Sequence, residues 1–215
     1  MPSRLKLLKS LEIDAYQLRN ISENPDPNGQ TDWSIIESQV STCKACQLHK
    51  GRNNPVFGDG DVNSDWFFIG EAPGKDEDLQ GKPFVGRAGR LLTEVIFSMG
   101  LSREEVFIAN ILKCRPPDNR DPKPGEVAKC FPYLEKQIEL VKPKVIVAVG
   151  RIAAHSLLGT DLPMGQLRGK IHDFGNNNIP TLVIYHPAYL LRSPSKKRKV
   201  WEDLQLVENI LDNDS

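Results

Sequence analysis

Apolar runs alternate with helical periodicities over most of the chain. Four short apolar runs predict buried strands at residues 66–69, 106–109, 144–149 and 181–185. Patterns with helical spacing lie between and after them, at residues 85–99, 125–140, 151–158 and 195–211. Strands that alternate with helices predict an α/β protein with three layers, α/β/α, around a central four-stranded parallel sheet. The strands are apolar almost throughout, as in a sheet that helices cover on both faces.

Two further helical patterns precede the first strand. One covers residues 5–18 and the other residues 33–40, with a segment rich in Asn, Pro and Gly between them. We therefore expect residues 1–42 to form an N-terminal helical extension. Residues 43–211 are expected to form the domain that carries the chemistry.

Polar residues and a glycine stand where the predicted strands end: Glu71, Asn110, Gly150 and His186. In an open parallel sheet these ends meet at one edge, which is where such sheets bind ligands. A single histidine after a strand is more often structural. A carboxylate, an amide and an imidazole that reach one crevice by the same topological rule predict a functional site.

The loop after the first strand superficially resembles a phosphate-binding loop. That motif requires four residues between its glycines and a Ser or Thr after its lysine, whereas only three residues lie between Gly70 and Gly74, and Asp76 follows Lys75. The acidic run at residues 76–78 would also repel a triphosphate. The sequence therefore argues against a nucleotide triphosphatase.

Composition narrows the class of protein further. The chain has 215 residues, 39% of them hydrophobic and 26% charged, which is ordinary for one globular domain. It contains no apolar run near 18 residues and no signal-peptide pattern, so we expect a cytoplasmic protein with no membrane contact. The formal net charge is zero, so nucleic-acid binding would have to come from a local basic patch.

Four cysteines stand at positions that suit a metal centre: Cys43, Cys46, Cys114 and Cys130. In the reducing cytoplasm they are not expected to form disulfides. The first two form a C-x2-C pair, which can hold one metal centre from a single turn. Four unrelated buried cysteines are the alternative, since free cysteine packs as a small hydrophobe. Spacing alone does not separate zinc from an iron–sulfur cluster, although the sequence Cys-Arg-Pro at Cys114 favours iron–sulfur.

A basic cluster follows the predicted site histidine. It comprises Arg192, Lys196, Lys197, Arg198 and Lys199. The apolar residues 188–191 beside it suit a wedge pressed into DNA, with the cluster on the phosphates. The alternative is a solvated helix face.

Four motifs in order and register resemble family 4 uracil-DNA glycosylases, the iron–sulfur type of bacteria and archaea. They are GEAPG with PFVGRAG downstream, NILKCRPPDNRDP, HPAYLLR and the four cysteines, and together they extend over residues 43–207. This sequence departs from the family pattern at Lys75, Asp118 and Ser193. The resemblance implies the uracil-DNA glycosylase fold and an enzyme of base excision repair, which flips uracil out of DNA and hydrolyses its N-glycosidic bond.

The resemblance also implies roles for individual residues. Phe84 would stack on the flipped uracil, and Asn110 would hydrogen-bond its Watson–Crick edge. Glu71 would orient water or stabilise the sugar cation, and His186 would donate to a uracil carbonyl oxygen as the base leaves. Three more residues of the same motifs would bind the substrate: Ala72, Gly74 and Glu77.

The cofactor and partners follow from the same family. The four cysteines would ligate a structural [4Fe-4S] cluster. The substrate would be uracil-containing DNA, single- or double-stranded, and the enzyme a monomer that contacts phosphates through its basic cluster.

Two rival interpretations have distinct requirements. A uracil-trapping relative uses a histidine in an extra loop, and residues 113–124 contain no histidine. A non-catalytic iron–sulfur or zinc DNA-binding module would not need Glu71, Asn110 and His186 at one crevice.

Overall fold

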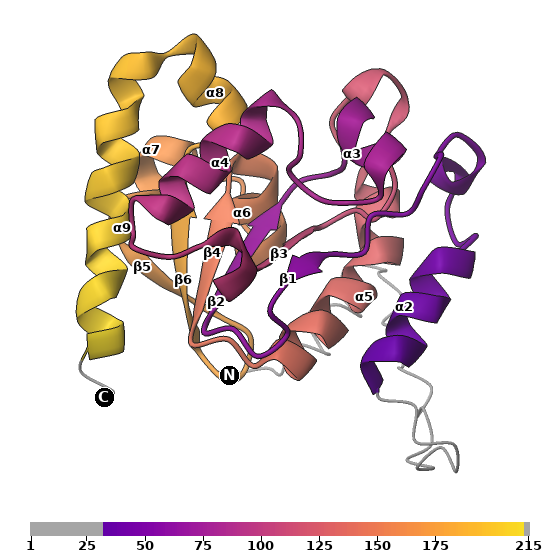
Figure 1. The fold of residues 1–215 in the computed structure, drawn as a ribbon, viewed down its shortest axis with the longest axis horizontal. Helices are drawn as coiled ribbons and strands as arrows, with labels where there is room; N and C mark the ends of the chain where they lie inside the picture. The colour runs from indigo at the N-terminus through magenta and orange to yellow at the C-terminus, as the bar shows by residue number, and fades with distance from the viewer. Residues whose placement is uncertain (1–31, 213–215) are drawn as a thin grey trace, which may run out of the picture. The chain divides into compact units, whose positions relative to one another are not determined.

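Six strands form one sheet in the order β1-β3-β2-β4-β6-β5 (Figure 1). The computed structural model describes residues 32–212. The strands are β1 (Asp59–Gly60), β2 (Trp66–Gly70), β3 (Phe107–Asn110), β4 (Val145–Val149), β5 (Ile171–Phe174) and β6 (Ile179–Ile184). The four central strands, β3, β2, β4 and β6, run parallel to one another, which confirms the predicted central sheet.

The two edge strands are antiparallel to their neighbours and were not predicted. β1 pairs with β3, and β5 pairs with β6. β1 has only two residues, too few for any periodicity. β5 has the sequence IHDF, and none of its residues is fully buried. Edge strands carry polar residues and short pairings, so they lack the apolar run that identifies a central strand.

Eight α-helices lie in the described part of the chain. They are α2 (Asp32–Thr42), α3 (Lys75–Gln80), α4 (Arg87–Phe97), α5 (Pro124–Val141), α6 (Arg151–Leu158), α7 (Met164–Leu167), α8 (Pro187–Arg192) and α9 (Lys197–Asp212). Short 3-10 turns are η1 (Gln47–Lys50), η2 (Arg103–Glu105), η3 (Pro117–Asn119) and η4 (Pro194–Lys196). Within these described residues no helix has the length and hydropathy of a membrane span.

Helices cover both faces of the sheet, because successive side chains of each strand point to opposite sides. Phe67 and Ile69 of β2 belong to one buried cluster, to which α5 and α6 contribute. Trp66 and Phe68 belong to the other, with residues of α4, α8 and α9 (Figure 1). The result is the predicted three-layer α/β/α arrangement.

Two predicted helices differ from the observed ones in a physically clear way. α5 begins one residue earlier than predicted, at Pro124, where the missing N–H of proline costs nothing because the first turn leaves that group unpaired. The helix predicted at 195–211 is divided into η4 and α9, which begins at Lys197. Pro194 lies in the first turn of η4.

The second N-terminal helical pattern forms α2, which packs against α5. Ile36 and Val40 are buried in a small cluster with Phe57. The ring of Trp33 stands edge-on to Phe57 and to Phe107, at centroid distances of 5.3 and 5.1 Å. The first pattern, at residues 5–18, lies outside the described residues. The compact unit that contains the sheet begins at Asp32.

Candidate active site

The parallel strands end level with one another at the edge where the sequence predicted a site. Gly70 pairs with Asn110 in the register of β2 and β3, and the pairing continues as Leu112 N–H donates to the Glu71 carbonyl at 3.0 Å. On the other side, Gly150 N–H donates to the Ile184 carbonyl at 2.9 Å, so β4 and β6 also end together. This topology directs the residues after β2, β3, β4 and β6 to one end of the sheet.

Phe84 and Asn110 meet above Gly70. A Cβ atom at position 70 would collide with Asn110 Oδ1 and with the edge of the Phe84 ring, so only glycine leaves space for both. Asn110 is 2% exposed, and its Oδ1 is the one buried side-chain nitrogen or oxygen of the described residues without a hydrogen-bond partner. An unpaired buried acceptor is costly and rare in native proteins. Its orientation therefore indicates a ligand with an N–H or O–H donor.

The loop that carries Phe84 is held in a strained conformation. Phe84 has φ 51°, in the left-handed region that residues other than glycine seldom occupy. Gly89 on α4 lies so close to the Phe84 backbone that an added Cβ would overlap it. Strain of this kind persists only where surrounding contacts impose it.

Two charged residues impose that conformation. Glu77 Oε1 accepts hydrogen bonds from Val85 N–H and Gly86 N–H, each at 2.9 Å. Arg103 donates to the Phe84 carbonyl at 3.2 Å and also to the Pro83 carbonyl. Sequence analysis missed Arg103 because it lies on η2, between two strands, where no motif marks it.

The other residues expected to bind substrate belong to the turn before α3. Gly74 N–H donates to Glu77 Oε2 at 3.1 Å, and a Cβ at position 74 would approach that oxygen to 2.7 Å. Both Glu77 oxygens are therefore engaged with backbone N–H groups on opposite sides of the loop. Ala72 is half-buried and packs against the cluster under α5 and α6.

His186 faces Phe84 as a neutral imidazole with a defined tautomer. The two ring centroids are 6.0 Å apart. Burial, with a further contribution from Arg192, lowers the pKa of His186 to about 4, against a smaller opposing effect of Glu77. Nδ1 accepts a hydrogen bond from Ala188 N–H at 3.1 Å, so the proton of the neutral ring is on Nε2. Gly150, at φ 94°, makes room for this side chain, since a Cβ there would lie 2.8 Å from His186 Cβ.

Glu71 is half-buried where β2 ends. Burial raises the pKa of its carboxyl group to about 7, Asp121 raises it further, and Arg151 opposes both effects. Arg151 and Asp121 form a salt bridge of 2.8 Å. The carboxyl group of Glu71 therefore titrates near neutral pH, a shift of the kind that clusters at functional sites.

Lys113 is buried beneath the site rather than directed into it. Its Nζ donates to the Asn110 carbonyl at 2.9 Å and to Gln137 Oε1. Burial lowers the pKa of Lys113 to about 8, with a smaller opposing effect of Cys130. The side chain holds the backbone of the residue whose amide faces the site.

The four cysteines are free thiols, of which Cys114 and Cys130 are buried and the other two are partly exposed. Arg52 donates to Cys114 Sγ at 3.0 Å, and Lys113 N–H donates to Cys130 Sγ at 3.3 Å. Burial raises the pKa of Cys130 to about 11, and the pKa of Cys114 rises through burial and, to a lesser degree, through Cys46 and Cys43. No three Cys, His, Asp or Glu side chains of residues 32–207 are arranged so that they could hold a single metal ion.

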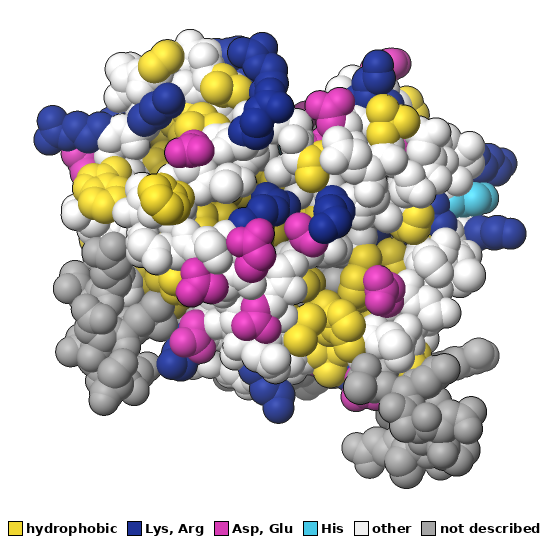
Figure 2. Space-filling model, in the orientation of Figure 1, with side chains coloured by type: hydrophobic (Ala, Val, Ile, Leu, Met, Phe, Trp, Pro, Cys, Tyr) yellow, Lys and Arg dark blue, Asp and Glu magenta, His cyan; other side chains and the backbone are white. Residues whose placement is uncertain are grey.

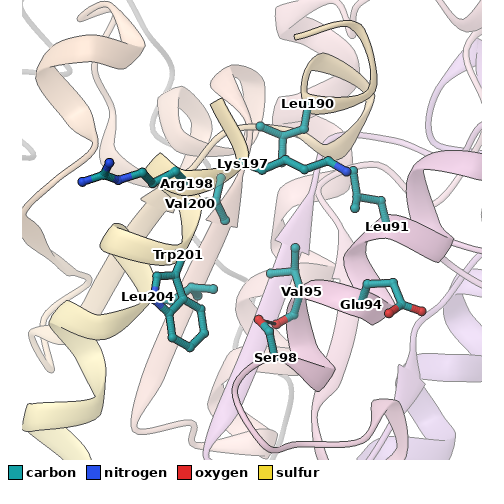
Figure 3. A pocket seen from close by; sticks show the side chains of 10 residues that line it. All are labelled: Leu91, Glu94, Val95, Ser98, Leu190, Lys197, Arg198, Val200, Trp201 and Leu204. Atoms are coloured by element: carbon teal, nitrogen blue, oxygen red, sulfur yellow. Dashed lines mark hydrogen bonds between the residues drawn. The ribbon is translucent and has the colours of Figure 1, made fainter. Parts of the chain in front are cut away.

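Two neighbouring side chains of the basic cluster beside α8 point in different directions. Arg198 pairs with Glu202 at 2.8 Å, and Figure 3 shows it pointing away from Lys197, which extends across a pocket toward α4. That pocket, of about 440 Å³, lies between α4 and α9 and is lined by Val95, Trp201 and other mainly apolar residues. Glu71, Phe84, Asn110 and His186 do not line it.

The predicted apolar wedge is only partly available. Leu190 is 1% exposed and belongs to the core, so it cannot enter DNA. Leu191 is 39% exposed, and Ala188 and Tyr189 are half-buried. The prediction was wrong for Leu190 because its helix buries one side against α4, a fact that a six-residue helix does not reveal by periodicity.

Comparisons with known proteins agree with this geometry. The family model of the uracil DNA glycosylase superfamily matches residues 57–205. The chain is 44% identical to the type-4 uracil-DNA glycosylase of Archaeoglobus fulgidus, over 80% of this chain and 89% of the relative. It is 44% identical to that of Saccharolobus solfataricus, over 82% and 85%, and 43% identical to that of Thermotoga maritima, over 82% and 93%. These matches confirm the resemblance seen in the motifs, and the chain belongs to the type-4 uracil-DNA glycosylases of the uracil DNA glycosylase superfamily.

Proposed function

We propose that the protein is a monofunctional uracil-DNA glycosylase, which hydrolyses the N-glycosidic bond of uracil in DNA and leaves an abasic site. The observation that carries the proposal is the buried, unpartnered Asn110 Oδ1 near Phe84, whose ring in turn neighbours His186. Uracil has a donor at N3–H and an acceptor at O4, which match the oxygen and nitrogen of an amide. Cytosine presents the reverse pattern and would leave the buried amide unpaired, which gives strong discrimination.

The reaction separates charge, and the two catalytic residues would stabilise opposite signs. Glu71 would stabilise the cationic sugar and orient water, and His186 Nε2–H would donate to the carbonyl oxygen of the departing uracil. A neutral imidazole suits this role because its proton is fixed on Nε2 by the Ala188 hydrogen bond. Phe84 would stack on the base once it has left the duplex.

Glu77, Ala72 and Gly74 would act at the rim of the same pocket. The carboxylate of Glu77 binds Val85 N–H and Gly86 N–H, which supports a role in holding Phe84 in its stacking position. Gly74 leaves room for that carboxylate. These three residues would thus shape the pocket through its loop.

The experiment that tests the function is an incubation with uracil-containing single-stranded oligonucleotide, followed by hot alkali. Cleavage at uracil only after alkali is the expected result, since alkali cuts abasic sites. Borohydride in the reaction should trap no protein–DNA adduct, because Lys113, the lysine nearest in sequence to Asn110, has its amino group engaged and buried. Release of no uracil, or a trapped adduct, would contradict the proposal.

We also propose a [4Fe-4S] cluster held by Cys43, Cys46, Cys114 and Cys130. Four free thiols, two of them with N–H donors directed at sulfur, are a donor set that fits iron–sulfur chemistry. A multinuclear cluster spaces its ligands more widely than one zinc ion does, which agrees with the absence of a single-ion arrangement among the described residues. When bound, the cluster would supply cross-links between the segment before η1, the end of β3 and α5.

A direct prediction concerns metal content. We expect the purified protein to be brown, with broad absorbance near about 400 nm and iron and sulfide in stoichiometric amounts. Cys130→Ser should lose the colour together with thermal stability, because a buried ligand is removed. A colourless parent protein with one zinc per chain would replace the iron–sulfur proposal by a zinc site.

Another prediction concerns pH. Because the pKa of Glu71 is about 7, the carboxylate is present above that pH and is lost below it. We expect kcat/KM to rise about tenfold per pH unit up to neutrality and then to level off. Glu71→Gln should remove this dependence and lower the rate, while uracil binding persists. Asp121→Asn should shift the midpoint to lower pH, since Asp121 raises the pKa of Glu71. An unchanged profile in Glu71→Gln would assign the titration to another group.

The proposed substrate is uracil-containing DNA, single- or double-stranded, bound by a monomer. Phosphate contacts would come from Arg192, from the half-buried Lys196 at the end of η4, and from Lys197 and Lys199 at the start of α9, which are exposed like Arg192. In Figure 2, Lys and Arg side chains lie over this upper left part of the molecule. Arg198 would contribute less, because Glu202 already neutralises it.

A further inference from the structure

A second basic surface lies at the cysteine segment and the start of α5, away from α8 and α9 (Figure 1). It is a groove of about 470 Å³ between the cysteine segment and the start of α5. The cationic residues that line it are Lys44, Arg120, Lys123 and Lys129. Figure 2 shows Lys and Arg side chains at this end of the molecule as well, on the right around η1. Lys123 and Lys129 lie outside the family motifs, and those motifs gave no role to Lys44 or Arg120.

The groove carries a positive charge that the protein does not neutralise. Glu126 is the acidic residue in its lining, and Arg120 binds it with two hydrogen bonds of 2.6 and 2.9 Å. The three lysines are exposed, and none of them takes part in a salt bridge within the described part of the chain. In a protein with zero formal net charge, such a local concentration of cations favours a polyanion.

One loop connects the groove to the catalytic carboxylate. Arg120 lines the groove, and the next residue, Asp121, is close enough to Glu71 to raise its pKa. The salt bridge between Asp121 and Arg151 ties this loop to the start of α6. The Arg120 guanidinium also donates to the Asp121 carbonyl at 2.9 Å, which stiffens the connection. A strand with its uracil at Glu71 would therefore pass from the site directly onto the groove.

We infer that this groove binds the sugar–phosphate backbone of the DNA strand on one side of the uracil, while the basic cluster at α8 and α9 serves the other side. The inference rests on the proposed function, because the uracil fixes where the strand lies. Lys123 and Lys129 contact phosphates, and the Arg120–Glu126 pair holds the floor of the groove. The chemistry required of the ligand is a row of phosphates, which a single nucleotide does not provide.

The test uses two single-stranded oligonucleotides, each with a non-reactive abasic analogue at one end. In one of them all other nucleotides lie on the 5′ side of the analogue, and in the other they lie on its 3′ side. Affinity is measured by fluorescence anisotropy over a series of salt concentrations. Lys123→Gln with Lys129→Gln should weaken binding of one of the two by about tenfold and flatten its salt slope by about 0.7 per lysine. Binding of the other oligonucleotide should remain at the parental value.

A matched control removes the same charge elsewhere. Lys136→Gln with Lys144→Gln replaces two lysines that pair with Glu139 and Asp65, each at 3.1 Å, and should change neither affinity.

Lys44 is not substituted in the groove variants, because it stands between two of the cysteines. Lys129→Glu is a second variant, with a larger effect expected on the same oligonucleotide. An equal loss of affinity for both oligonucleotides, or no loss for either, would contradict the inference that the groove binds the DNA backbone. Uracil release by the parent enzyme from a short oligonucleotide tests the proposed function separately.

Discussion

Asn110→Asp should lower the single-turnover rate of uracil release by two to three decades. The substitution replaces the donor nitrogen of a buried amide by an acceptor oxygen, and an ionised carboxylate would repel O4 of uracil. Loss of one preorganised donor at a developing charge costs about 3 kcal/mol, which corresponds to that change in rate. The new carboxylate would instead suit the exocyclic amine of cytosine. Rates are to be measured with saturating enzyme, so that a binding defect is not counted as a catalytic one.

A matched control is Asn178→Asp, which makes the same chemical change on an exposed turn residue with φ 50°. Asparagine and aspartate both tolerate that conformation, so the rate should be unchanged. If Asn110→Asp released uracil at the parental rate, the recognition pocket would not lie at the end of β3.

His186→Ala should have an effect of similar size through the leaving group. The variant loses the Nε2–H donor for the developing uracil anion, and we expect a loss of about two to three decades in single-turnover rate. His186 also accepts a hydrogen bond from Ala188 N–H at the start of α8, so alanine should lower stability by about 1 kcal/mol as well.

His186→Ser separates the two effects. Serine is a good N-cap but its hydroxyl is too short to reach the base, so stability should be largely restored while the rate stays low. Thermal unfolding and single-turnover kinetics on both variants give the comparison. Full activity in His186→Ser would show that the imidazole serves only as a cap.

Contacts with neighbouring side chains hold Asn110 and Phe84 in place. Asn110 is fixed from below by Lys113, whose Nζ binds the Asn110 carbonyl. Phe84 is fixed by Glu77 on one side and Arg103 on the other. The roles proposed for Asn110 and Phe84 would require such supporting contacts, because the atoms that would meet the base must stay free of other partners.

The sequence alone determined the centre of the fold and the residues at its edge. The four parallel strands are apolar runs of four to six residues, with every residue buried in β2, β3 and β4. Their ends are marked by Gly70, Asn110, Gly150 and the residue before α8, His186. In a parallel sheet the direction of the chain dictates which edge these residues reach, so local sequence is sufficient for the placement of Glu71, Asn110 and His186.

Asp118 illustrates an intermediate case. Sequence analysis noted Asp118 as a departure from the pattern of the resembled family, and the structure gives Asp118 a φ of 53°, in the left-handed region that favours glycine. The sequence thus identified a departure, and the backbone supplied its reason.

Only the tertiary structure decided which side chains are exposed and unpaired, and so able to bind DNA. It shows that Leu190 is core, that Arg198 is paired with Glu202, that Lys113 is buried and that the Glu77 carboxylate binds the Phe84 loop. It also brings Lys44 into one groove with Lys123 and Lys129, which are distant from it in the chain. Periodicity reports only the average environment along one element. Burial and pairing depend on which distant element packs against it, and for these residues that neighbour exists only in the folded chain.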